Sequence, residues 1–323
     1  MAVVDYLTQQ SWFGVAKETT PGTPVTTPQF FVPMRSPKLA PKLKWLPDNS
    51  MLGSPSFTND LVPGKRYDDF SMKHGLYMDS IGHELMAILG VDTVSGTGPY
   101  HHKFQLYNNP VAGGQPPSYT LDFFDGYQMR QLAGSKLNTL ELNWSADGEV
   151  EVTPSWICQP EVDVVTPVNT PSTAHFVPGW DLGVTINSVA SGIMVSGSLT
   201  ISRNAEPIFV SDATQGAHQL FSGYITVKGK AKFLLESGTI NFFGATGMAR
   251  SQIPVIFNFT EPVSGSTLTF TMSACQFMNP TNDPGQKYVQ VDTEFEGVGN
   301  TTDAISSFSP IQASLTIPQS TPF

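Results

Sequence analysis

The sequence predicts a mainly β protein, a β-sandwich or barrel with one flanking α-helix and extended segments beside it. Three observations support this class. Glycine (28 residues) and proline (26 residues) are abundant and aromatic residues make up 11% of the chain, which favours short strands joined by turns. From Ser118 onward, apolar residues recur mostly with a period of two. A helical period is clear in one place, near residues 76–89.

Residues 1–70 are predicted to form an extended, proline-rich arm. Nine prolines punctuate its last fifty residues, which excludes a helix and weakens any central strand. Its aromatic residues indicate that the arm packs on the protein's own core or on a neighbouring subunit. We therefore treat as candidate inter-subunit contacts Trp12, Phe13, Phe30, Phe31 and Trp45, and, farther along the chain, Phe242 and Phe243.

Residues 71–323 are predicted to form the β-sandwich domain. The flanking helix near 76–89 has Asp79 and Ser80 as candidate N-caps, and Gly90 stands just past its end. Asp147-Gly148 predicts a tight hairpin, and the Pro/Thr/Val-rich stretch near 162–178 predicts a long loop. A short helical turn is predicted near 213–221. Further strands are predicted at 193–201, 225–235, 253–260, 268–277, 289–297 and 311–317.

Charge and composition exclude several classes of protein. The net charge is −10 and the isoelectric point is about 4.9, whereas a protein that grips nucleic acid through its phosphates should be basic. No basic segment followed by an apolar run marks a signal peptide, and no apolar stretch approaches ~20 residues. We therefore expect a soluble protein made in the cytoplasm. Cys158 and Cys275 are expected to be reduced and buried.

No group of residues predicts catalysis, a metal site or a cofactor. Adjacent residues of a strand point to opposite faces, so His101 and His102 are not expected to share a metal ion. His83-Glu84 lacks the second histidine of a zinc-protease helix, and we expect it at the surface. Asp68, Asp69, Asp122 and Asp125 are expected to be solvated turn acids. The sequence therefore predicts no enzyme.

One charge pattern points to a function. Carboxylates occupy the polar faces of the strand at 289–297 and of the hairpin around Asp147-Gly148: Glu141, Glu149, Glu151, Asp292, Glu294 and Glu296. They are either ordinary solvated strand faces or the wall of a shared, water-filled passage, with Lys228, Lys230 and Lys232 facing elsewhere. An acidic wall would repel nucleic-acid phosphates and let DNA slide past.

Four sequence blocks, in order along the chain, carry a resemblance to a known family. They are GVAKETTPGT at 14–23 with FFVP at 30–33, GSKLNTL at 134–140 leading into ADG at 146–148, GSLTISRNAEP at 197–207, and FSGYITVKG at 221–229. Their ordered combination resembles the siphophage major tail-tube proteins, and it reaches from the start of the chain to about residue 230.

This resemblance implies a structural subunit of the virion tail, made in the host bacterial cytoplasm. Such subunits form rings, commonly of six chains, which stack into a hollow tube around a tape-measure protein and meet tail-tip and tail-terminator proteins. DNA passes through without specific binding, and extended arms clasp the adjoining ring. This chain is longer than the shortest family members, so either one fold carries elaborations or two tandem domains form rings of fewer chains. The alternative function is a glycan- or receptor-binding β-sandwich module of a phage virion.

Overall fold

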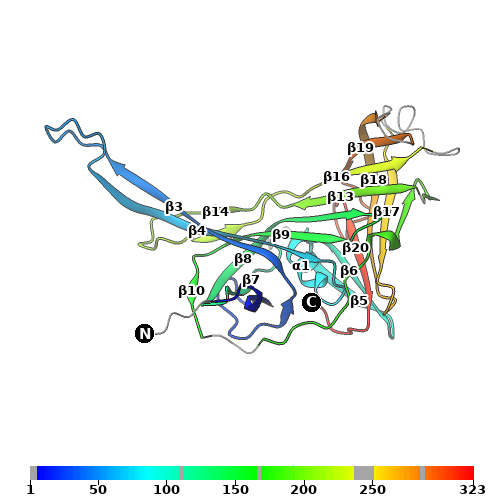
Figure 1. The fold of residues 1–323 in the computed structure, drawn as a ribbon, viewed down its shortest axis with the longest axis horizontal. Coiled ribbons are helices and arrows are strands. Elements are labelled where there is room, and N and C mark those ends of the chain that lie inside the picture. The colour runs from blue at the N-terminus through cyan, green and yellow to red at the C-terminus, as the bar shows by residue number, and fades with distance from the viewer. Residues whose placement is uncertain (1–5, 109–112, 166–168, 192, 236–250, 284–287) are drawn as a thin grey trace.

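The fold is known from a computed structural model, which describes the chain except for residues 1–5, 109–112, 166–168, 192, 236–250 and 284–287. Two packed layers of antiparallel strands form a body, with a helix on one flank and a long hairpin projecting from one end (Figure 1). Among the described residues, α1 (Ile81–Leu89) is the one α-helix. The predicted fold class, mainly β with one flanking helix, is confirmed.

The secondary structure elements are named here with their bounds. The strands of the first half are β1 (Trp12–Lys17), β2 (Phe30–Val32), β3 (Arg35–Asp48), β4 (Asp60–Gly75), β5 (Gly90–Ser95), β6 (Tyr100–Leu106), β7 (Tyr119–Phe124), β8 (Met129–Ser145), β9 (Glu151–Cys158) and β10 (Val162–Asp163). Those of the second half are β11 (Leu182–Ile186), β12 (Val189–Ala190), β13 (Met194–Ser202), β14 (Glu206–Ile208), β15 (Gln219–Phe221), β16 (Thr226–Leu234), β17 (Ile253–Thr260), β18 (Thr267–Asp283), β19 (Gln290–Gly297) and β20 (Gln312–Ile317). Short 3-10 turns span Thr8–Gln10 and Gly179–Asp181.

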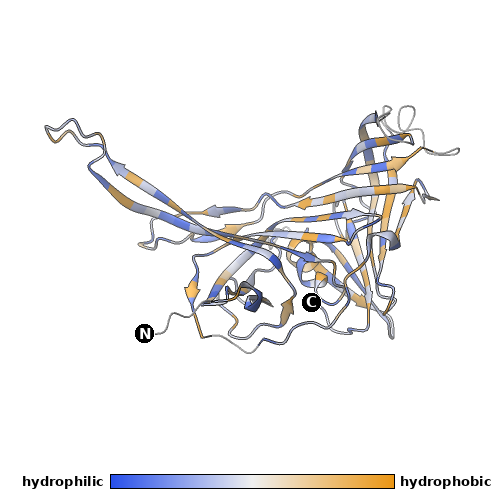
Figure 2. Ribbon diagram, viewed as in Figure 1, coloured by the Kyte–Doolittle hydropathy of each residue, from blue (hydrophilic) through white to orange (hydrophobic). Residues whose placement is uncertain are grey.

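Most strands of the body form two layers that share β18, and β1, β2, β7 and β10 are joined to the first layer through β8. The first layer runs β3–β4–β9–β8–β13–β16–β19–β18, and the second runs β12–β11–β17–β18–β20–β6–β5. Figure 2 shows apolar and polar residues alternating along many of these strands, as expected when one face of each layer is buried. The layers meet in an aromatic core, where the Trp144 ring centroid lies 5.3 Å from that of Phe257 and 5.4 Å from that of Phe259.

Helix α1 ends where the sequence predicts and begins later. Gly90 has a φ of 97°, a left-handed conformation that suits glycine and ends the helix. Leu76 is not helical, because its N–H donates to Val150 O at 2.8 Å and its carbonyl accepts from Val177 N at 2.9 Å. The helix therefore begins at Ile81, and its apolar residues are buried against β5, β6 and β8.

Much of the predicted proline-rich arm is a long β-hairpin. β3 and β4 pair from Arg35 opposite Lys73 to Asp48 opposite Asp60, and this hairpin extends away from the body (Figure 1). Among the described residues β4 is the strand partner of β3, so the prolines of β3 lie on an edge strand, where a missing N–H is tolerated. The predicted division after residue 70 falls inside β4, whose last part pairs with β9.

Three local predictions have clear outcomes. The helical turn predicted near 213–221 is wrong, because Gln219–Phe221 forms β15 and pairs with β14. The long loop is confirmed in outline: between β10 and Gly179, the described residues hold isolated β-bridges and no further helix or strand. Cys158 and Cys275 are buried free thiols, as predicted.

Candidate functional site

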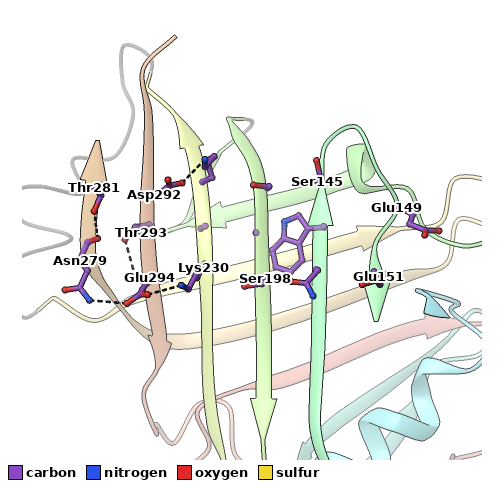
Figure 3. Close-up of a pocket in the computed structure, with 16 residues that line it drawn as sticks. Ser145, Glu149, Glu151, Ser198, Lys230, Asn279, Thr281, Asp292, Thr293 and Glu294 are labelled. Atoms are coloured by element: carbon purple, nitrogen blue, oxygen red, sulfur yellow. Dashed lines mark hydrogen bonds and ion pairs between the residues drawn. The ribbon is translucent and has the colours of Figure 1, made fainter. Parts of the chain in front are cut away.

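A polar surface of the body is formed by one face of five neighbouring strands, β9, β8, β13, β16 and β19. Their antiparallel registers place polar residues side by side across the strands, as in the row Asn143, Ser198, Lys230 and Glu294 (Figure 3). We call this surface the charged face and define it by Glu141, Asn143, Ser145, Glu151, Ser196, Ser198, Thr200, Lys228, Lys230, Lys232, Asp292, Glu294 and Glu296, together with Glu149, Arg35 and Lys73 at its border. An open groove of about 890 Å³ runs over it.

The opposite face of the same strands is core. Leu142, Leu199, Ala231 and Phe295 lie on four of the five strands, and each is at most 2% exposed. Side chains alternate between the two faces of a strand, so burying these residues forces their neighbours outward. The charged face is thus fixed in place by the hydrophobic core behind it.

The lysines of β16 lie on the charged face, directly opposite the acids of β19. The N–O distances are 3.7 Å for Lys228–Glu296, 3.3 Å for Lys230–Glu294 and 3.4 Å for Lys232–Asp292. The sequence-based expectation that these lysines face elsewhere is therefore wrong. The antiparallel register of β16 and β19 sets each lysine beside a carboxylate, which is a favourable cross-strand pair.

The remaining candidate acids also lie near this face and mostly have partners. Glu149, in the turn before β9, pairs with Arg35, and Glu151 pairs with Lys73 at 2.7 Å. Glu141 accepts a hydrogen bond from Asn143 Nδ2 at 2.9 Å. The six candidate carboxylates thus meet five cations, which leaves a net charge of −1. The six acids are spread along this face from β9 to β19, and with their partners they form a surface that is nearly neutral.

Two of the paired groups have pKa values shifted by their partners. Hydrogen bonds from Asn279 and Lys230 lower the pKa of Glu294, and the hydrogen bond to Glu151 raises the pKa of Lys73. Shifts in these directions move both pKa values farther from neutrality. Pairing therefore stabilises the charged form of each of these two groups.

The aromatic contact candidates are divided between core and surface. Phe13 is 1% exposed and its ring stacks on Phe70 with centroids 5.1 Å apart, so it belongs to the core of its own subunit. Trp12 is also buried, beside the half-buried Phe31. Of the two placements predicted for the aromatic residues of the arm, Trp12 and Phe13 thus pack within their own subunit.

Among the arm's contact candidates, Trp45 on β3 is exposed, with 53% of its surface accessible. Phe30 is half-buried against the core, and Phe242 and Phe243 lie outside the described residues. Met51, Leu52 and Phe57 are not among the contact candidates predicted from the sequence, yet all three are exposed at the end of the hairpin. Their signal in the sequence is an apolar set within a Gly/Pro/Ser-rich turn.

Other charged candidates turn out to be buried and paired. Glu84, expected at the surface, accepts from His74 Nε2 at 2.8 Å inside the body, and His83 beside it is also buried. Asp68, expected to be solvated, is buried and accepts two hydrogen bonds from Arg66. Glu84 meets His74 only when α1 packs on β4, whereas Asp68 pairs with a residue two positions before it in the sequence.

Two kinds of feature, a metal-binding group and a membrane-spanning helix, are absent from the described part of the chain. It holds no group of three or more His, Cys, Asp and Glu residues that could bind a metal ion. Within the same residues, no helix has both the length and the apolar character needed to cross a membrane.

Comparison with known proteins identifies the family. The profile described as phage tail tube protein matches residues 8–297, a span that includes the hairpin, α1 and the whole charged face. A comparison with curated proteins gives no match. Nothing in these comparisons favours the glycan- or receptor-binding alternative. The chain therefore belongs to the phage tail tube protein family, as a structural subunit of the virion tail that assembles with other tail proteins into the tube through which DNA is ejected.

Proposed function

We propose that the charged face is the wall of the conduit. The observation that carries this proposal is a polar face over five strands with a ladder of charge pairs between β16 and β19, exposed on one side and anchored by the core on the other. DNA binding depends largely on neutralisation of phosphates by excess positive charge. A face with a net charge near −1 offers no such excess, so DNA would slide along it without specific binding.

This wall differs in kind from the acidic wall that the sequence suggested. Five of its six carboxylates have a cation within 4 Å. These carboxylates would therefore not simply repel phosphates at long range. Opposite charges this close cancel over distances well below the Debye length of roughly 8–10 Å. The polar groups would hold a water layer between protein and DNA, and the role of the chain is structural, without catalysis.

The assembly we propose is a siphophage tail tube of stacked rings with six chains each. Its partners would be a tape-measure protein inside the tube and tail-tip and tail-terminator proteins at its ends. Both layers of the body join through β18 into one sheet system, which supports a single elaborated fold over two tandem domains. The charged fraction of only 14% suits a subunit that buries much of its surface, because interface cores are depleted in charge.

The β3–β4 hairpin is proposed to clasp the adjoining ring. Its end exposes apolar side chains, including Met51 and Phe57, that gain from burial against another subunit. Residues 35–66 hold six basic and two acidic residues, whereas the whole chain holds 17 basic and 27 acidic. The hairpin is thus basic and the rest of the chain acidic. Four of the six cations pair with acids of the same chain, so Lys38 and Lys44 are the cations that would favour contact with the acidic body of another copy.

Electron microscopy of purified protein and of phage particles tests this function. We expect hollow tubes with six chains per ring, the charged face on the inner wall and the hairpin in contact with the next ring. If both samples contain discrete oligomers and no tubes, the result would favour the receptor-binding alternative. Tubes whose charged face lies on the outer surface would contradict the proposal that this face is the wall, and the chain would still be a tube subunit.

A further inference from the structure

Arg203, just past the end of β13, is a buried cation without an internal counter-ion. The residue is 4% exposed, and its side chain donates from Nη2 to Gly114 O at 3.1 Å. Its Nε is buried without a hydrogen-bond partner, and within the described part of the chain no carboxylate lies within ion-pair distance. Leaving a buried charge unpaired is costly, so this arrangement requires an explanation.

The nearest charges do not supply a partner. Lys136 is also buried and donates to Pro116 O, and the positive charge of Arg203 adds to burial in lowering the pKa of Lys136 to about 8. Burial lowers the pKa of Arg203 itself to about 10. Glu18 is the acid that acts on Lys136, but its two oxygens already accept four hydrogen bonds. Two cations are thus buried here, and the carboxylate of Glu18 is occupied.

Arg203 lines an open pocket that contains a second unmatched donor. The pocket has a volume of about 640 Å³, and Ser222 forms part of its wall. Ser222 is 2% exposed, and its Oγ is buried without a hydrogen-bond partner. A guanidinium and a hydroxyl on one pocket match the two oxygens of a carboxylate, which accepts several hydrogen bonds and neutralises the cation.

We propose that the Arg203 pocket binds a carboxylate, supplied by an Asp or Glu side chain of an adjoining copy of this chain in the tube. The chain carries ten more acidic than basic residues, so its copies present carboxylates in excess. The pocket rim includes Tyr224, which is 71% exposed, and Phe221, which is 37% exposed, and both would be covered by a neighbour. Subunit association would then supply the counter-ion that the free subunit lacks.

Arg203→Met separates this role from a purely structural one. Methionine removes the unpaired charge and keeps apolar bulk, so the free subunit should unfold at the same or a higher urea concentration. Tube growth should slow about tenfold, the loss expected for one charge-assisted contact. Arg203→Lys, which keeps the charge and loses the planar fork, should lie between Met and wild type. A destabilised Met variant whose tubes grow at the wild-type rate once it is folded would overturn the proposal.

Glu206 provides the matched control, because it is an acidic residue that lines the same pocket. Glu206→Gln should leave tube growth unchanged or faster. A slowing equal to that of Arg203→Met would show that Glu206 is itself the partner, and the neighbour's carboxylate would be excluded.

Acetate distinguishes a neighbour's carboxylate from a free anion. At constant ionic strength, acetate in place of chloride should slow wild-type tube growth by competing for the pocket, and it should not affect Arg203→Met. If acetate stabilises the free wild-type subunit while growth is unaffected, and Arg203→Met assembles normally, the pocket takes a small anion from solution and the proposed contact is wrong.

Discussion

Glu18 joins separate segments of the chain through one buried carboxylate. It accepts from Gly22 N at 2.8 Å and Gly134 N at 2.7 Å, and from the hydroxyls of Ser118 at 2.6 Å and Thr120 at 2.9 Å. The turn that follows β1 is thereby tied to β7 and β8. Hydrogen bonds to an ionised acceptor are stronger than neutral ones, so this residue should contribute much to local stability.

Glu18→Ala should therefore destabilise the free subunit strongly. The substitution leaves several buried donors without an acceptor, and we expect a loss of about 3–5 kcal/mol in the free energy of unfolding. Urea unfolding of the purified subunit measures it. Glu206→Ala, which removes an exposed carboxylate, serves as the control and should cost less than about 0.5 kcal/mol. Equal losses in the two variants would contradict the assignment.

Asp122 on β7 gives a pH-dependent prediction. It is 2% exposed, and burial raises its pKa to about 6, although Gln131 Nε2 donates to its Oδ1 at 3.0 Å. The pKa of Asp122 is higher in the folded than in the unfolded chain. The free energy of unfolding that this group contributes is therefore fully present below its ordinary pKa of about 4 and is lost as the pH rises through 6. Asp122→Asn should thus stabilise the subunit by about 2–3 kcal/mol at pH 7.5 and by little at pH 4. Urea unfolding at both pH values measures this gain, and a gain that is independent of pH would exclude ionisation as its cause.

At the residue scale, the sequence predicts which faces are polar better than it predicts which charges are buried. Charged residues are usually exposed, which is why Glu84 was expected at the surface. Its partner His74 lies on β4, and only the packing of α1 against the sheet brings the two together. The alternation along β16 correctly predicted one polar lysine face, but the identity of its neighbour β19 depends on a pairing across about sixty residues of sequence.

At the scale of elements, local chemistry sets the boundaries that the sequence predicts well. Gly90 ends α1, and the strand predicted at 253–260 coincides with β17. The β3–β4 hairpin was missed as a pair of strands because its prolines argue against a central strand. That argument remains valid, since β3 lies at an edge, where proline removes no ladder hydrogen bond.

The hairpin end gives a prediction about assembly. Met51, Leu52 and Phe57 are each at least 68% exposed, so replacing all three with serine removes little burial within the subunit. We expect an unchanged urea midpoint and a severe loss of tube formation, measured by sedimentation and electron microscopy. Ile305→Ser, a change of an exposed apolar residue on the body, is the control and should assemble. Normal tubes from the triple variant would remove the hairpin end from the proposed contact with the next ring.

At the scale of the whole molecule, charge is unevenly distributed. The chain has a net charge of −10, yet the candidate acids and their partners on the charged face, Arg35 included, sum to −1, and residues 38–66 sum to +3. Most of the negative charge therefore lies on other surfaces. Subunits of like net charge repel, so their association depends on local matching, for which the basic hairpin and Arg203 are the two candidates.

The sign of charge on the proposed wall should set the rate of DNA passage. Asp292→Asn with Glu294→Gln and Glu296→Gln would change the charge of this face from −1 to +2, leaving three lysines unpaired. Because these side chains are exposed, tubes should still form, but DNA release from particles should slow through attraction to phosphate, and high salt should relieve the delay. Replacing Lys228, Lys230 and Lys232 with glutamine changes the charge to −4 and should not slow release. Equal release rates in both variants and wild type would place this face away from the DNA.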